Sequence, residues 1–164
     1  MTKDEMKKVV CQAIDEAAEK IHETVLRIES EPELGYKETK TAAKVESYMK
    51  ELGLTPQTGL ALTGVKTCVD GGKKGPAVAV LAELDAVGTP DSPKADPLTG
   101  AAHTCGHFLQ MASMLAACTG IVKSGVMQDL AGSAVFFAVP AEEYVEIDYR
   151  KRLVKEGKIH FLGG

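Results

Sequence analysis

Two short, almost entirely apolar segments constrain the fold of this chain most strongly. They are Ala77–Ala82 and Ser133–Val139, and each is bounded by glycine, proline or a charged residue. Apolar runs of this length without alternation are typical of strands that are covered on both faces, as in sheets that lie between layers of helices. We therefore expect both segments to be buried strands of an α/β sheet.

Four other segments place apolar residues three and four positions apart, a spacing that predicts amphipathic helices. The predicted helices span residues 4–28, 38–52, 107–121 and 148–155. Thr2 and Glu5 have the spacing of a capping box at the start of the first helix, and Gly53 is suited to end the second in a left-handed conformation. Strands and helices thus alternate along the chain, which predicts an α/β domain with helices on both faces of the sheet.

A third strand is predicted at Val65–Asp70. The Gly71-Gly72 pair that follows it would allow a hairpin with the strand at 77–82. Residues 88–100 contain two glycines and three prolines and form a loop of unusual length for a compact domain. Because functional residues are concentrated on such loops, this segment is a candidate functional region.

The composition fits one globular domain and limits its partners. Of the 164 residues, 45% are hydrophobic and 26% are charged, and the interspersed charges give a net charge of -4, so we expect no nucleic-acid partner. No segment reaches the roughly 18 apolar residues of a membrane span. The four cysteines have no short repeated spacing, which favours a reducing cytoplasm over a disulfide-forming environment.

The first candidate site lies at the start of the third predicted helix. Cys105 and His107 flank Gly106, and a bend at the glycine would bring a thiolate and an imidazole to one cation. The alternative is a histidine that only packs in the core, because His107 shares a helical face with Met111 and Met114. The spacing alone leaves both interpretations open.

The second candidate site follows the strand that ends at Val139. Glu142 and Glu143 are adjacent, so in extended backbone one carboxylate could hold a metal while its neighbour faces the substrate as a base. Ligands of open α/β sheets bind beyond the carboxyl ends of the strands, where Asp85 also lies. The alternative is a solvated pair of glutamates at the start of a loop.

Four motifs occur in an order that resembles the metal-dependent amidohydrolase and zinc-exopeptidase family. This family includes aminoacylases, hippurate hydrolases, auxin-conjugate hydrolases and aminobenzoyl-glutamate hydrolases. The motifs are Pro32–Thr39, Leu81–Ala86, His103–His107 and Pro140–Glu143, and the ending Glu156–Gly164 is similar to the aminobenzoyl-glutamate hydrolase branch. The resemblance covers nearly the whole chain and implies a three-layer α/β/α sheet of the zinc-exopeptidase type, covered by helices and incomplete in this chain.

The resemblance also implies an activity: hydrolysis of the amide bond of N-acyl amino acids or small peptides with one or two divalent metal ions, zinc or manganese. Carried onto matching positions, it makes Cys105, His107 and Glu143 metal ligands. Glu142 would be the general base that acts on a metal-bound water. Asp85 would be a carboxylate that orients His107.

The chain departs from the family pattern close to these positions. Phe108 and Gln110 stand where the family usually has Asp or Asn and a further His, and Thr104 replaces a more usual Ala. Gln110, one helical turn beyond the metal-ligand histidine, would partly replace the lost polar groups. Glu83 matches a position close to the metals in the broader family, but we do not include it in the predicted ligand set.

Family members are also much longer. We interpret residues 1–164 as the N-terminal portion of a catalytic domain, without the inserted lid domain and the C-terminal portion that would carry the later histidine ligands. The 164-residue chain alone is therefore expected to be inactive, and the full-length form is expected to be a homodimer that binds no membrane. The alternative hypothesis is a truncated, non-catalytic homologue that acts as a binding or interaction module.

Overall fold

The helices and strands expected from the sequence are present in the computed structural model, which describes residues 1–163. Gly164, the last residue of the predicted domain, lies outside the described residues. The helices are α1 (Lys3–Glu29), α2 (Thr39–Glu51), α3 (His107–Ser124) and α4 (Ile147–Lys155), with a 3-10 turn η1 (Val126–Asp129). The strands are β1 (Gln57–Leu60), β2 (Gly64–Asp70), β3 (Lys73–Glu83), β4 (Val87–Gly88), β5 (Ala101–Ala102) and β6 (Ala131–Val139).

The residues that begin and end the helices act as the sequence predicts. Thr2 Oγ1 accepts a hydrogen bond from the backbone N–H of Glu5 at 3.3 Å, and the Glu5 carboxylate accepts one from the backbone N–H of Thr2 at 2.7 Å. Gly53 follows α2 with a φ of +82°, a left-handed conformation that suits glycine. No helix within residues 1–163 has both the length and the apolar character that crossing a membrane requires.

The main sheet has four strands in the order β1-β2-β6-β3. β6 is antiparallel to β2 and parallel to β3, so it lies between two strands that are consecutive in the sequence. The predicted hairpin between residues 65–70 and 77–82 is therefore wrong. The physical reason is burial of the most apolar strand: in the middle of the sheet, Phe136 of β6 has Thr67 beside it in β2 and Val80 beside it in β3.

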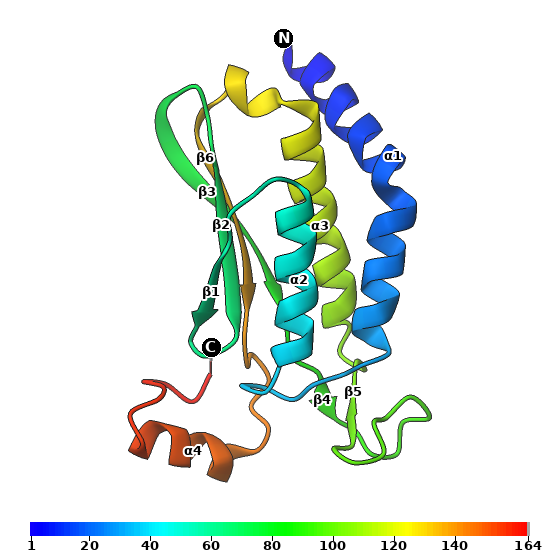
Figure 1. The fold of residues 1–164 in the computed structure, drawn as a ribbon, viewed down its shortest axis with the longest axis vertical. Helices are drawn as coiled ribbons and strands as arrows, with labels where there is room; N and C mark the ends of the chain where they lie inside the picture. Colours follow the sequence, from blue (N-terminus) through cyan, green and yellow to red (C-terminus); the bar gives the residue numbers. More distant parts are fainter. Residues whose placement is uncertain (164) are drawn as a thin grey trace.

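Helices α2 and α3 pack on one face of this sheet, and α1 packs against α3. Figure 1 shows α1, α2 and α3 side by side along the strands, while α4 lies beyond one end of the sheet. The main core fills the space between the helices and the sheet. Its fully buried members include Ile28, Val45, Met49, Leu115 and Phe136.

The opposite face of the sheet and the outer edge of β3 are not covered by any element of residues 1–163. Val78 and Leu81 in β3 are 63% and 60% exposed. The expectation that the run at 77–82 is covered on both faces is thus wrong for this part of the chain, because no element of residues 1–163 packs against the second face. The α/β class is confirmed, and the described residues form two of the three expected layers, a sheet and one layer of helices.

Phe136 provides a test of this core. The side chain is 1% exposed and lies in the main cluster, so Phe136→Ala is expected to lower the free energy of unfolding by about 3–5 kcal/mol through lost burial and a cavity. Urea unfolding measures the change. Phe161→Ala is the matched control, because Phe161 is 77% exposed and its truncation is expected to cost less than about 0.5 kcal/mol. Equal unfolding midpoints for the two variants would contradict this description of the core.

The parallel pairing of β3 and β6 determines where functional groups can meet. Glu83 at the end of β3 lies beside Val139 at the end of β6, so the carboxyl ends of both strands lie at the same edge of the sheet. This is the edge at which open α/β sheets bind their ligands. The long loop predicted at residues 88–100 connects the short strands β4 and β5, which pair with each other as a separate ribbon.

Candidate active site

Three chain segments meet at the edge of the sheet where β3 and β6 end. One follows β3, the second is the turn into α3, and the third follows β6. Gly106 has a φ of +103° and makes the turn after which α3 begins, a backbone conformation that favours glycine. The segments contribute six side chains with metal-binding or acid–base groups: Glu83, Asp85, Cys105, His107, Glu142 and Glu143.

His107 lies at the centre of this group and is 2% exposed. Its Nε2 is 2.9 Å from Glu83 Oε2, 3.7 Å from Glu142 Oε2 and 3.8 Å from Glu143 Oε1. Its Nδ1 is 2.8 Å from the backbone oxygen of Asp85 and 3.4 Å from Asp85 Oδ1. Because a carbonyl oxygen can only accept, Nδ1 carries the proton of that hydrogen bond, and Nε2 is the nitrogen that faces the three glutamates.

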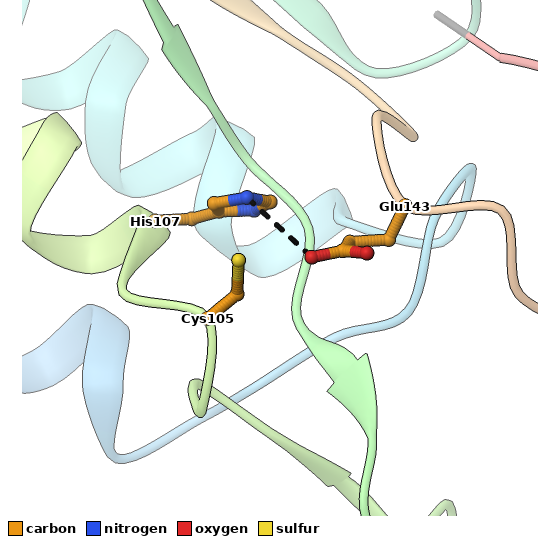
Figure 2. A group of neighbouring side chains, drawn as sticks. All are labelled: Cys105, His107 and Glu143. Atoms are coloured by element: carbon orange, nitrogen blue, oxygen red, sulfur yellow. Dashed lines mark ion pairs between the residues drawn. The ribbon is translucent and has the colours of Figure 1, made fainter.

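Two overlapping groups of side chains could each hold a metal ion. Cys105, His107 and Glu143 each offer one ligand atom, and these atoms all lie within 4.8 Å of one another. Figure 2 shows the His107 imidazole, the Cys105 thiol from the turn before α3 and the Glu143 carboxylate from the segment after β6 pointing toward one another. Glu83, His107 and Glu142 form the second group by the same criterion. His107 is the member that the two groups share.

The charge balance of the site perturbs the pKa values of its members. Burial lowers the pKa of His107, but hydrogen bonds to Asp85 and the charge of Glu83 outweigh it and raise the pKa to about 9. The Glu143 carboxylate, followed by burial and other nearby carboxylates, raises the pKa of the Cys105 thiol to about 11. Burial and the charges of Glu83 and Glu143 raise the pKa of Glu142. A site with this excess of carboxylates favours the binding of a cation.

The structure brings together all five residues that the sequence analysis assigned to the site. Asp85 lies against His107 as expected, although its closest contact is made by the backbone oxygen and not by the carboxylate. Glu83, which matches a position close to the metals in the family but was left out of the predicted ligand set, has the carboxylate closest to His107 Nε2. A signal was present, because Glu83 and Asp85 are two residues apart at the end of a strand and such residues point to the same side.

The side chains that depart from the family pattern lie around the start of α3. Phe108 is partly buried against the core, and its ring centroid is 5.8 Å from that of His103. Burial, with a smaller effect of the nearby His107 charge, lowers the pKa of His103 to about 4. Gln110 is exposed, and its predicted role as a replacement polar group stays a prediction.

Comparison with known proteins finds relatives that are hydrolases. The chain is 32% identical to the amidohydrolase-type protein YhaA of Bacillus subtilis over 85% of its own length and 35% of the relative's. It is 30% identical to N-acetylcysteine deacetylase of the same organism, over 68% of this chain and 30% of that protein. The chain thus spans about a third of the length of the curated relatives it matches. No protein-family model matches it.

The fold also matches a solved structure. The crystal structure of Bacillus subtilis YxeP, described as a dinuclear metal-binding peptidase of the M20 family, superimposes with a TM-score of 0.66 and 24% identity, over 84% of this chain and 39% of that chain. This superposition shows that the two chains share a fold. By its sequence relatives, the chain is a homologue of a part of the amidohydrolases and deacetylases that it matches.

Proposed function

We propose that this chain supplies part of the catalytic site of a metal-dependent amidohydrolase that cleaves the amide bond of N-acyl amino acids or small peptides. The observation that carries the proposal is the arrangement around His107, where Nε2 faces Glu142 and Glu143 within 4 Å and the Cys105 thiol lies beside them. Two relatives support it: the deacetylase acts on an N-acyl amino acid by its name, and YxeP binds two metals by its description.

The donor set fits a divalent cation. Cys105, His107 and Glu143 offer sulfur, nitrogen and oxygen, the three ligand types that zinc accepts in proteins. The hydrogen bond between His107 Nδ1 and Asp85 keeps a proton on Nδ1, so Nε2 is the nitrogen that can coordinate once its own proton is displaced. When bound, a divalent cation lowers the pKa of a water and polarises the scissile carbonyl. We propose zinc or manganese, since ligand type alone separates these metals weakly.

Glu142 is the residue best placed to move a proton. Its side chain is 51% exposed, so it can reach a substrate, and it is not a member of the Cys105–His107–Glu143 group. Its pKa is raised by burial and by neighbouring carboxylates, which brings it closer to the operating range of a base at neutral pH. In the proposed reaction Glu142 takes a proton from the attacking water and returns it to the leaving amine.

Metal content is the direct test of this proposal. After loading with zinc or manganese and dialysis, the chain is expected to retain about one metal ion, measured by mass spectrometry, because the thiolate, imidazole and carboxylate lie on one preformed edge. Cys105→Ser is expected to lose the metal. Cys68→Ser is the matched control and is expected to retain it, because Cys68 is an exposed thiol in β2, outside the cluster. Equal metal content in the two serine variants would contradict the assignment.

The remaining expectations rest on the same family relation. We propose a cytoplasmic location, in which all four cysteines stay reduced as they are in the structure. We also propose that the complete enzyme is a homodimer and that its partners are small substrates. The alternative of a non-catalytic binding module is not supported, because the named relatives are hydrolases.

A further inference from the structure

Arg150 in α4 is fully buried, with an exposed fraction of 0%. Within the described part of the chain it forms no ion pair with a carboxylate. Instead its guanidinium donates to three backbone oxygens: Nη1 to Ala141 at 3.0 Å and to Leu162 at 2.7 Å, and Nη2 to Glu143. A buried cation needs such partners, because it has lost its hydration.

Two aromatic rings complete the surroundings of this guanidinium. Its central carbon lies 5.4 Å from the ring centroid of Tyr36 and 5.8 Å from that of Tyr144. Gly35 makes the approach possible, because a Cβ at this position would collide with Arg150 Nη2 and would lie 2.9 Å from Ala141 Cα. A planar group with donors in a rigid fork and a face that stacks on rings is specific to arginine, and lysine does not reproduce it.

The backbone that Arg150 holds is the segment that carries the two site glutamates. Ala141 has a φ of +56°, a left-handed conformation that is uncommon for alanine. Its N–H donates to the buried carboxylate of Glu38 at 2.8 Å, while its C=O accepts from Arg150. Two residues later, the N–H of Glu143 donates to Asp85 Oδ2 at 2.9 Å and its C=O accepts from Arg150. Buried charged side chains thus hold the backbone on both sides of Glu142.

We propose that Arg150 is a positioning residue, which holds the backbone from Ala141 to Glu143 so that the Glu142 and Glu143 side chains face His107. The proposal rests on the proposed function, because its consequence is the affinity of the metal site. Arg150 touches neither His107 nor Cys105 in the described contacts, so it acts through the direction of the glutamates. Without the guanidinium, the unusual conformation at Ala141 loses the donor to its carbonyl and the carboxylates turn away from the imidazole.

The first test compares cobalt(II) binding by the 164-residue chain and by Arg150→Lys. The lysine keeps the charge but cannot bind the three carbonyl oxygens in one plane, so we expect cobalt affinity to fall by about 10–100-fold, as for other residues that orient metal ligands. The thiolate-to-cobalt absorption band reports the titration, and circular dichroism reports the fold. Arg152→Lys is the matched control on the same helix, because Arg152 is exposed; its affinity is expected to stay unchanged.

A double-mutant cycle separates positioning from general damage. Glu143→Gln alone is expected to weaken cobalt binding, and Arg150→Lys is expected to add little in that background, because the group through which it acts has been removed. Additive losses would overturn the positioning role while leaving the metal site in place. If Glu143→Gln binds cobalt as tightly as the unchanged chain, the proposed ligand set is wrong. The proposed role of Arg150, which acts through Glu143, is then wrong as well.

A second variant covers the case in which Arg150→Lys does not fold. Tyr144 is 65% exposed, so Tyr144→Leu removes one ring beside the guanidinium with little effect on the core. We expect a several-fold loss of cobalt affinity in this folded variant, and the loss should disappear in the Glu143→Gln background. Unchanged cobalt affinity in Tyr144→Leu together with an unfolded Arg150→Lys would overturn the proposal, because Arg150 would then serve the fold alone.

Discussion

Glu142→Gln is expected to lower the turnover of an N-acyl amino acid by about 10²–10⁴-fold, the usual contribution of a general base. Glutamine has nearly the same shape but cannot accept the proton from the attacking water. The side chain is half exposed and is not a member of the Cys105–His107–Glu143 group, so the metal ion held by that group should be retained. The measurement is steady-state hydrolysis of an N-acetyl amino acid by the longest natural form of the protein, with metal analysis of the same samples.

Two neighbouring substitutions serve as controls for this loss. Glu143→Gln is expected to lower both activity and metal content, because Glu143 belongs to the thiol–imidazole–carboxylate group. Glu146→Gln is expected to change neither, since Glu146 forms an ion pair with Lys37 at 2.7 Å, outside the cluster. Normal turnover by Glu142→Gln would exclude it as the base, and loss of metal in Glu142→Gln would show that it acts as a ligand.

The helices could be predicted from the sequence because their signals are local. The capping box at Thr2 and the left-handed Gly53 depend on residues within one turn of the helix end. The strand order could not be predicted in the same way. The pairing of β6 with both β2 and β3 joins residues far apart in the chain, and the Gly71-Gly72 pair resembled the turn of a hairpin because local turn chemistry does not reveal an inserted strand.

The candidate site shows the same division between local and distant signals. Cys105 and His107, like Glu142 and Glu143, are near neighbours in the sequence, so short motifs pointed to them. No short motif in the sequence indicated a role for Arg150. Its role depends on the backbone oxygens of the segment after β6 and of the C-terminal residues, and a pattern of residue types does not encode contacts to backbone groups.

The location of the uncovered apolar surface also required the structure. The sequence of β3 is that of a strand covered on both faces, but Leu81 is 60% exposed because the described chain places no element against that face. The apolar residues of β3 are therefore typical of a strand that is covered on both faces, whereas in residues 1–163 one face of this strand is exposed. The carboxyl ends of β3 and β6 are nevertheless adjacent, so residues 1–163 bring the proposed metal ligands together at one edge of the sheet.

Metal affinity is expected to rise steeply with pH, by about 100-fold per unit between pH 6 and pH 9. Without metal, the pKa of His107 is about 9 and that of Cys105 is about 11, so at neutral pH both groups carry protons at the atoms that would coordinate. Binding must displace a proton from His107 Nε2 and another from the Cys105 thiol. Release of about two protons gives a slope of about two in the logarithm of the affinity against pH. Above pH 9, where His107 is already neutral, the slope should fall to about one.

Calorimetric titration with zinc in buffers of different ionisation enthalpy measures the number of protons released. For the unchanged chain at pH 7 we expect about two, and at the same pH the Cys105→Ser variant should release about one for whatever metal it still binds, because serine keeps its proton. The Cys68→Ser variant controls for the loss of any thiol. Release of two protons by Cys105→Ser would mean that a different group is the second source, and a pH-independent affinity would mean that neither His107 nor Cys105 coordinates the metal.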